Sequence, residues 1–178
     1  MGMIEVRYKS IPGGGLPPFH KYIIYTDSNG KEWYARGGST EVGGPFPWSG
    51  DVDTDYGEYV KPVGDNRSPD WNIDKDGNVR VDGREPLLIG DDLSPWWDKI
   101  KNRMQEIEDG KYKYDADKQN SNTTADDALR YAGLREPRKD GTFPSPGSLN
   151  KTTGDGAQLI LSRVNNPKGT EPCHAVQG

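Results

Sequence analysis

Cysteine and histidine are scarce in this chain of 178 residues, which has one cysteine, Cys173, and two histidines, His20 and His174. A single cysteine excludes an internal disulfide and a cysteine-rich zinc site. Any histidine-based catalysis must use His20 or His174. Cys173 and His174 adjoin in the C-terminal tail, where neighbouring side chains of an extended segment point opposite ways, so we interpret them as an incidental pair.

Apolar residues are also in short supply, at 31% of the chain, whereas glycine (23) and proline (14) are abundant. No apolar run is long enough for a transmembrane segment, and the N-terminus lacks the apolar core of a signal peptide. The net charge of −5 and the scattered basic residues argue against nucleic acid as a partner. We expect no cofactor. The 5 Trp, 9 Tyr and 3 Phe can build a modest core.

The length favours a single domain over residues 1–178. Alternating or continuous apolar residues predict strands at 3–9, 20–26 and 31–36, the last two joined as a hairpin by the Asp-Ser-Asn-Gly turn. Residues 38–95 are expected to form a loop-rich insertion, because Gly, Pro, Asp and Ser dominate its first half. Within it, the pattern indicates a short strand at 56–60 and a hairpin at 71–82.

Two helices are predicted after this insertion. The first helix is predicted to start at Ser94, because a capping hydroxyl followed by proline is typical of a helix N-terminus. Apolar residues at helical spacing then continue this helix to Gly110. A second helix is expected at 123–131, with Gly133 as its stop. Residues 158–164 are predicted to form a strand or a short helix, and residues 165–178 are predicted to form a flexible tail. The predicted class is α+β, with a small antiparallel sheet, two or three helices and long ordered loops.

His20 and Ser121 are the candidate catalytic pair. A histidine at a strand start can accept the proton of a hydroxyl that attacks a carbonyl carbon. Ser121 precedes the second helix, where the N–H groups of residues 121–123 could stabilise an oxyanion, and Asn120 and Asn122 could orient the imidazole or donate to that oxyanion. The same Asn-Ser-Asn-Thr run is equally typical of plain helix capping, and such a histidine is often structural.

Two segments carry a family resemblance: FHKYIIYTDSNGKEWYARGGS, which starts at residue 19, and KYDADKQNSNTTADDALRYAGL, which ends at residue 134. Together with the following AGLREPRKDGTFPSPGSLN, they resemble the circularly permuted papain-like hydrolases. That superfamily includes permuted NlpC-type peptidases, lecithin:retinol acyltransferase-like proteins and PPPDE peptidases. The Asn-Ser-Asn-Thr run further resembles domains of bacterial polymorphic toxins and effectors.

The resemblance implies roles for named residues. His20 would be the base, and Ser121 would occupy the position where the family has its cysteine nucleophile. Ser121 is then the natural nucleophile, an engineered replacement of cysteine, or the mark of an inactive descendant. A polar residue of the second hairpin strand should orient the imidazole, and Glu32 suits an imidazolium better than Tyr34 or Arg36. Tyr34 and Arg36 are also expected, with Trp48 of a Gly/Pro-rich loop, to line the substrate cleft.

The resemblance also implies a substrate and a setting. We expect hydrolysis of, or acyl transfer from, an amide, ester or thioester in a peptide, a peptidoglycan peptide, a protein or an acyl lipid. The protein would be a bacterial effector or toxin delivered outside the producing cell, with a cognate immunity protein as a partner.

Two other functions stay open. One is a catalytically inactive binding module that uses its aromatic loops. The other is a calcium-stabilised adhesion module, because Asp51, Asp53 and Asp55 offer oxygen ligands. A second acidic run from Asn72 opens like an EF-hand loop, but its twelfth position is Gly83 instead of a bidentate glutamate.

Overall fold

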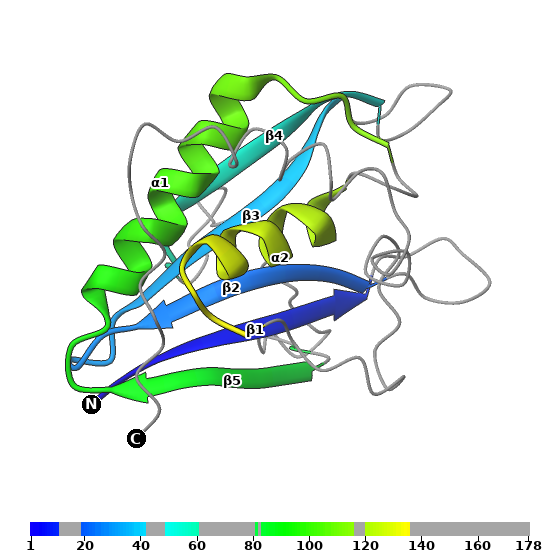
Figure 1. Ribbon diagram of the computed structural model, residues 1–178. Coiled ribbons are helices and arrows are strands. Elements are labelled where there is room, and N and C mark those ends of the chain that lie inside the picture. The colour runs from blue at the N-terminus through cyan, green and yellow to red at the C-terminus, as the bar shows by residue number, and fades with distance from the viewer. Residues whose placement is uncertain (11–18, 42–48, 61–80, 82, 116–119, 136–178) are drawn as a thin grey trace, which may run out of the picture.

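The computed structural model describes residues 1–10, 19–41, 49–60, 81, 83–115 and 120–135 (Figure 1). These residues form five strands and two helices. The elements are β1 (Gly2–Ser10), β2 (Phe19–Thr26), β3 (Glu32–Glu41), β4 (Ser49–Glu58), β5 (Gly83–Gly90), α1 (Ser94–Gly110) and α2 (Ser121–Tyr131). The chain therefore has the predicted α+β architecture with a small antiparallel sheet.

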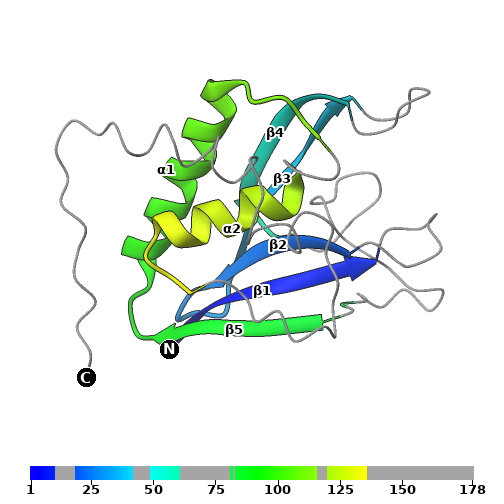
Figure 2. The ribbon, with the colours of Figure 1, turned by 45° about the vertical axis from the view of Figure 1, so that its right-hand side comes forward.

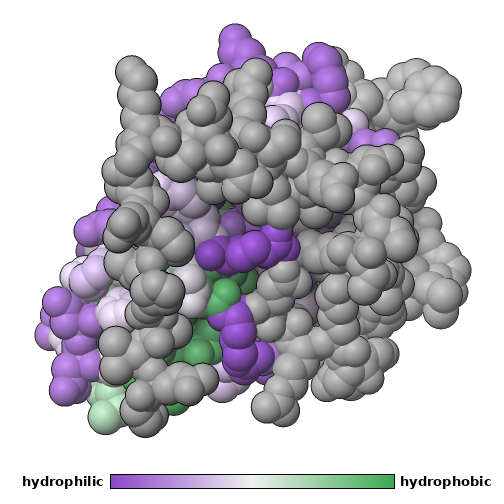
Figure 3. All heavy atoms as spheres, viewed as in Figure 1, coloured by the Kyte–Doolittle hydropathy of each residue, from purple (hydrophilic) through white to green (hydrophobic). Residues whose placement is uncertain are grey.

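The strands make one sheet in the order β4-β3-β2-β1-β5, and every neighbouring pair is antiparallel. Both helices cover the same face of this sheet (Figures 1 and 2). Alternate residues of the central strands, including Ile4, Val6 and Ile23, pack there against Ile100 of α1 and Leu129 of α2. The outer side of α1 carries hydrophilic side chains (Figure 3). This amphipathic division is what places α1 on the sheet.

The opposite face of the sheet is buried as well. Tyr22 and Ile24 of β2 form a cluster there with Tyr34 and Tyr59. Because both faces of β2 are buried, the strand shows a nearly continuous apolar run instead of a strict alternation.

Three strands differ from the prediction. β3 runs through the two glycines expected to end it and reaches Glu41, and β4 forms where a loop with a short strand at 56–60 was expected. β5 was not predicted at all, and Pro86 within it is compatible with its position at the sheet edge. The insertion at 38–95 thus contributes two edge strands. The predicted hairpin at 71–82, the element at 158–164 and the tail at 165–178 lie outside the described residues, with the exception of Val81. Val81 has no regular secondary structure.

The start of α1 differs from the prediction in its capping residue. Ser94 is the first helical residue, and both its backbone N–H and its hydroxyl donate to the carboxylate of Asp92, at 3.0 and 2.6 Å. These two hydrogen bonds lower the pKa of Asp92. The side-chain hydrogen-bond acceptor at the start of α1 is therefore the carboxylate of Asp92, whereas the sequence predicted the hydroxyl of Ser94.

β2 and β3 separate part of the way along their length. Their pairing runs from Thr26 and Glu32 as far as Ile23 and Ala35; beyond that point, among the described residues, β2 pairs with β1 and β3 pairs with β4. The first turns of α2 lie across this gap between the strands. The backbone N–H of Lys21 donates to Asn122 Oδ1 at 2.7 Å. A side-chain amide of the helix therefore takes the place of a strand partner.

On the β3 side of the same gap, Gly37 gives α2 room to approach. A Cβ atom at Gly37 would lie 2.7 Å from the Cβ of Thr124, closer than such atoms approach in proteins. We expect Gly37→Ala to lower the free energy of unfolding by about 1–3 kcal/mol, because the helix or the strand must shift. Gly57→Ala is the control: its new Cβ would lie 3.5 Å from the Tyr34 ring, an ordinary contact. Urea unfolding of the two variants measures the difference, and equal stability would contradict the close approach.

Candidate active site

The structure brings His20 and Ser121 together although 101 positions separate them in the chain. His20 is the second residue of β2, Ser121 is the first residue of α2, and His20 Nδ1 lies 2.9 Å from Ser121 Oγ. A neutral imidazole that accepts the hydroxyl proton at Nδ1 carries its own hydrogen on Nε2. The pair has the contact that a base and a hydroxyl nucleophile require.

Both members of the pair are buried, with exposed fractions of 5% for His20 and 7% for Ser121. The Tyr22 ring stacks against the imidazole, with 6.2 Å between the ring centroids and an interplanar angle of 15°. Burial strengthens the hydrogen bond, because little water competes for it. It also means that little of the Ser121 surface is open to a substrate.

Asn120 caps α2. Its Oδ1 accepts from the backbone N–H groups of Asn122, at 2.9 Å, and Thr123, at 3.3 Å. Its backbone carbonyl accepts from the N–H of Thr124 at 3.0 Å. Asn120 is thus a helix cap, as one interpretation of the sequence proposed. Asn122, bonded to Lys21, ties that cap to the strand that carries His20.

This capping changes which groups can hold an oxyanion. The N–H groups of residues 122 and 123 were expected to contribute, but they already donate to Asn120. Ser121 instead interacts through its backbone and its side chain with the hydroxyl of Tyr114. Ser121 N–H is therefore the backbone donor beside the nucleophile.

Tyr114 was not predicted as a site residue. Burial raises the pKa of its phenol, while hydrogen bonding with the backbone and the side chain of Ser121 and the positive charge of Arg36 oppose that rise. The segment 112–114 runs beside β4: Tyr114 N–H donates to the carbonyl of Gly50 at 2.9 Å, and Val52 N–H donates to that of Tyr112 at 2.6 Å. This pairing fixes the phenol next to Ser121. Nothing in the sequence pattern of this segment linked it to the start of the second helix.

Glu32 does not meet the prediction that it orients the imidazole. It pairs with Thr26, six residues along β2 from His20, which is about 20 Å at the usual rise of a strand. Its carboxylate instead accepts from the Arg7 guanidinium, which also donates to Glu5 at 2.6 Å. The two carboxylates raise the pKa of Arg7 against the opposing effect of burial. Glu32 thus belongs to a buried charge cluster at the far end of the hairpin.

The residues expected to line a substrate cleft separate into three cases. Tyr34 is buried in the cluster on the second face and donates its hydroxyl to Asp55 at 2.8 Å, so it does not line a cleft. Arg36 lies within electrostatic reach of Tyr114, which puts its charge near the candidate pair. Trp48 lies outside the described residues.

The acidic residues of β4 are not arranged as a calcium site. Asp51 pairs with Lys113 at 2.6 Å, and Asp55 accepts from Tyr34. Burial and the charges of Glu108 and Asp55 raise the pKa of Asp53. In the part of the chain that the structure describes, no group of three or more His, Cys, Asp or Glu side chains is suited to hold a metal. These aspartates lie along an extended strand instead of a loop that wraps an ion.

Two buried ion pairs hold α2 in place. Lys21 Nζ lies 2.6 Å from Asp126 Oδ1, and Arg103 Nε of α1 lies 2.6 Å from Asp127 Oδ2. Each of these two aspartates therefore has a specific cationic partner. The first pair links α2 to β2 next to His20, so it sets the spacing of the candidate site.

Comparison of the chain with protein-family models, with curated proteins and with solved structures found no match. In the described residues, neither helix is both long and apolar enough to cross a membrane.

Proposed function

We propose that this protein is a hydrolase or acyltransferase that acts on an amide, ester or thioester bond through Ser121 and His20. The observation that carries the proposal is the 2.9 Å contact between His20 Nδ1 and Ser121 Oγ at the start of a helix. A serine hydroxyl does not ionise near neutral pH, so it needs an adjacent base to become a nucleophile. His20 is in position to be that base.

The reaction would proceed by ordinary acyl transfer. Ser121 Oγ attacks the carbonyl carbon of the substrate, and its proton passes to His20 Nδ1. The carbonyl oxygen becomes an oxyanion that the Ser121 N–H can bind once the Tyr114 hydroxyl moves or turns to donate as well. The imidazolium then gives the proton to the leaving group. Water, deprotonated by the same imidazole, or a second acceptor takes the acyl group from Ser121.

The substrate class rests on the resemblance to permuted papain-like hydrolases. It favours a peptide, a peptidoglycan peptide, a protein or an acyl lipid, and an effector or toxin role with an immunity protein as partner. This part of the proposal is analogy, since fold alone does not determine function.

A serine-directed fluorophosphonate probe tests the proposed nucleophile. We expect the unaltered chain to be labelled at Ser121, the Ser121→Ala variant to be unlabelled, and the His20→Gln variant to be labelled at least about 100-fold more slowly, since general-base assistance contributes that much. Thermal unfolding of each variant shows whether the fold is retained. Equal labelling of the unaltered chain and Ser121→Ala would refute the assignment.

The burial of the pair favours a second candidate function, that of an inactive binding module. In that case, the His20–Ser121 hydrogen bond would only join β2 to α2. This alternative predicts no labelling of a folded chain by the probe. It further predicts a loss of stability of about 1 kcal/mol in Ser121→Ala, the net contribution of one hydrogen bond.

A further inference from the structure

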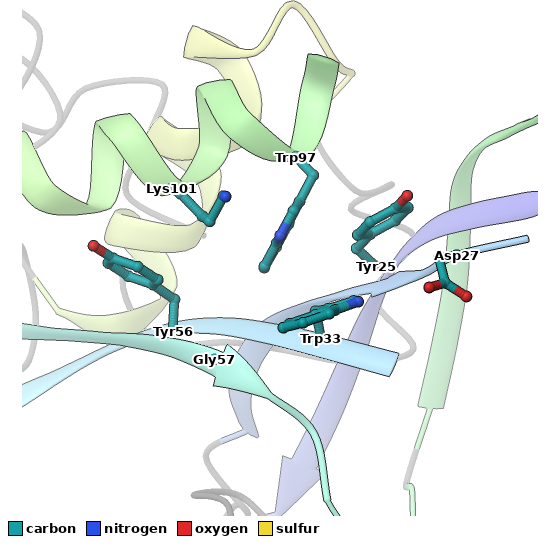
Figure 4. A pocket seen from close by; sticks show the side chains of 7 residues that line it. All are labelled: Tyr25, Asp27, Trp33, Tyr56, Gly57, Trp97 and Lys101. Carbon is teal, nitrogen blue, oxygen red and sulfur yellow. The ribbon is translucent and has the colours of Figure 1, made fainter. Parts of the chain in front are cut away.

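A cavity lies on the helix face of the sheet, away from His20 and Ser121. It has a volume of about 480 Å³, within the range of small-molecule sites, and is lined by Tyr25, Asp27, Trp33, Tyr56, Trp97 and Lys101 (Figure 4). Tyr25 is five residues along β2 from His20, so the two places are about 17 Å apart. We call this cavity the aromatic groove.

Four aromatic rings form the walls of the aromatic groove. Trp97 projects from α1 toward the ring of Trp33, and Tyr25 and Tyr56 lie on either side (Figure 4). The Tyr25 and Trp97 centroids are 5.6 Å apart. The ammonium of Lys31 already lies 4.5 Å from the centroid of the Trp33 ring. That contact shows that this indole accepts a cation against its face.

The charges around the aromatic groove are mostly negative. Asp27 lies at one end of it (Figure 4), and the charges of Asp27, Asp92 and Asp98, added to burial, raise the pKa of the Tyr25 phenol. Lys101 is the cationic residue of the lining, and its ammonium is paired with Asp98 at 2.9 Å. The Lys31 ammonium, which lies beside the Trp33 ring, is paired with Glu58 at 2.8 Å. The groove therefore combines electron-rich ring faces with a net negative potential.

We propose that the aromatic groove is a binding site for an organic ammonium cation, such as a quaternary trimethylammonium group. Aromatic walls with nearby carboxylates are the arrangement that favours such groups over neutral or anionic ligands. The cation would lie between Trp33 and Trp97 toward the Asp27 end, away from Lys101. This site is separate from the proposed acyl-transfer site and does not depend on it.

Choline and its neutral isostere, in which a tert-butyl group replaces the trimethylammonium group, are the matched probes. Titrations followed by the indole N–H resonances in proton–nitrogen correlation spectra report binding at Trp33 and Trp97. We expect choline to bind about tenfold more tightly than the isostere, the size of a partly desolvated cation–π contribution. Trimethyllysine, free and within a short peptide, distinguishes a protein side chain from a small molecule as the source of the ammonium group.

Three variants locate the site. Trp33→Leu removes the ring and should weaken choline binding at least about fivefold. Asp27→Asn removes a negative charge but keeps the side-chain oxygen that accepts from the N–H groups of Asn29 and Lys31, at 2.8 and 2.9 Å, so the turn is retained. Choline binding should therefore weaken a few-fold through the lost charge alone. Trp96→Phe, outside the described lining, should leave binding unchanged. Equal affinities for choline and its isostere, or no shift of either indole by any ammonium probe, would overturn the proposal.

Discussion

In a chain with Ser121→Cys and Cys173→Ser, we expect His20→Ala to slow alkylation of the new thiol by iodoacetamide about 100-fold near pH 6. The reason is that only the thiolate reacts, and a neighbouring imidazolium lowers a thiol pKa from about 8.5 to between about 3.5 and 7.5. His20 Nδ1 lies 2.9 Å from the oxygen that the sulfur would replace. Without the imidazolium, most of the thiol is protonated at this pH. Cys173→Ser removes the other thiol, so labelling reports a single position.

The dependence on pH separates this electrostatic effect from a change of fold. With His20 present, the alkylation rate should stay high well below pH 8, whereas in the His20→Ala chain it should fall about tenfold for each unit below the pKa of an ordinary thiol, about 8.5. His174→Ala, which removes the other histidine of the chain, is the control and should leave the profile unchanged. Identical profiles with and without His20 would show that the two side chains do not interact chemically.

Removing one member of the buried pair Lys21–Asp126 should lower the free energy of unfolding by about 3–5 kcal/mol. The side chains are 4% and 1% exposed, so Asp126→Ala leaves an ammonium group in a site that excludes water, and Lys21→Met leaves a carboxylate there. The double variant Lys21→Met/Asp126→Leu removes both charges and should recover most of the loss. Urea unfolding gives the three free energies and the coupling between the residues.

The control for this prediction is an exposed ion pair of similar length. Lys31 Nζ lies 2.8 Å from Glu58 Oε2, but both side chains are 44% exposed, so Glu58→Gln should cost less than about 1 kcal/mol. A comparable loss at the two pairs would mean that burial does not decide their contribution. Because Asp126 holds α2 against β2, its removal should also slow probe labelling at Ser121, even where the variant remains folded.

The hairpin and the helices could be predicted because local pattern and tertiary role agree there. β2 is rich in β-branched and aromatic residues, and α1 repeats its apolar residues at helical spacing. β4 and the extension of β3 could not be predicted, because their aspartates and glycines disfavour strands locally. Gly37 lies in a strand for a reason visible only in three dimensions, the approach of Thr124.

The candidate site was predictable only in part. The order of a histidine on a hairpin and Asn-Ser-Asn before a helix led to His20 and Ser121, and the structure brings the two side chains into contact. Their companions depend on contacts between distant segments. Tyr114 reaches Ser121 because the segment before α2 pairs with β4, and Glu32 is excluded by the direction of the hairpin. The first fact has no signal in the local sequence, whereas the second follows from the predicted turn, which puts Glu32 at the turn end of the hairpin and His20 at its open end.

The gap between β2 and β3, which the first turns of α2 cover, has a consequence for the order in which the site appears during synthesis. The five described strands and α1 precede Ser121 in the chain, so a ribosome makes these elements before it adds the candidate nucleophile. Until α2 docks, the N–H of Lys21 lacks its Asn122 acceptor and His20 lacks its hydroxyl partner. A nascent or truncated chain that stops before α2 therefore contains His20 without the Ser121 hydroxyl, and the candidate pair forms only when α2 docks on the sheet.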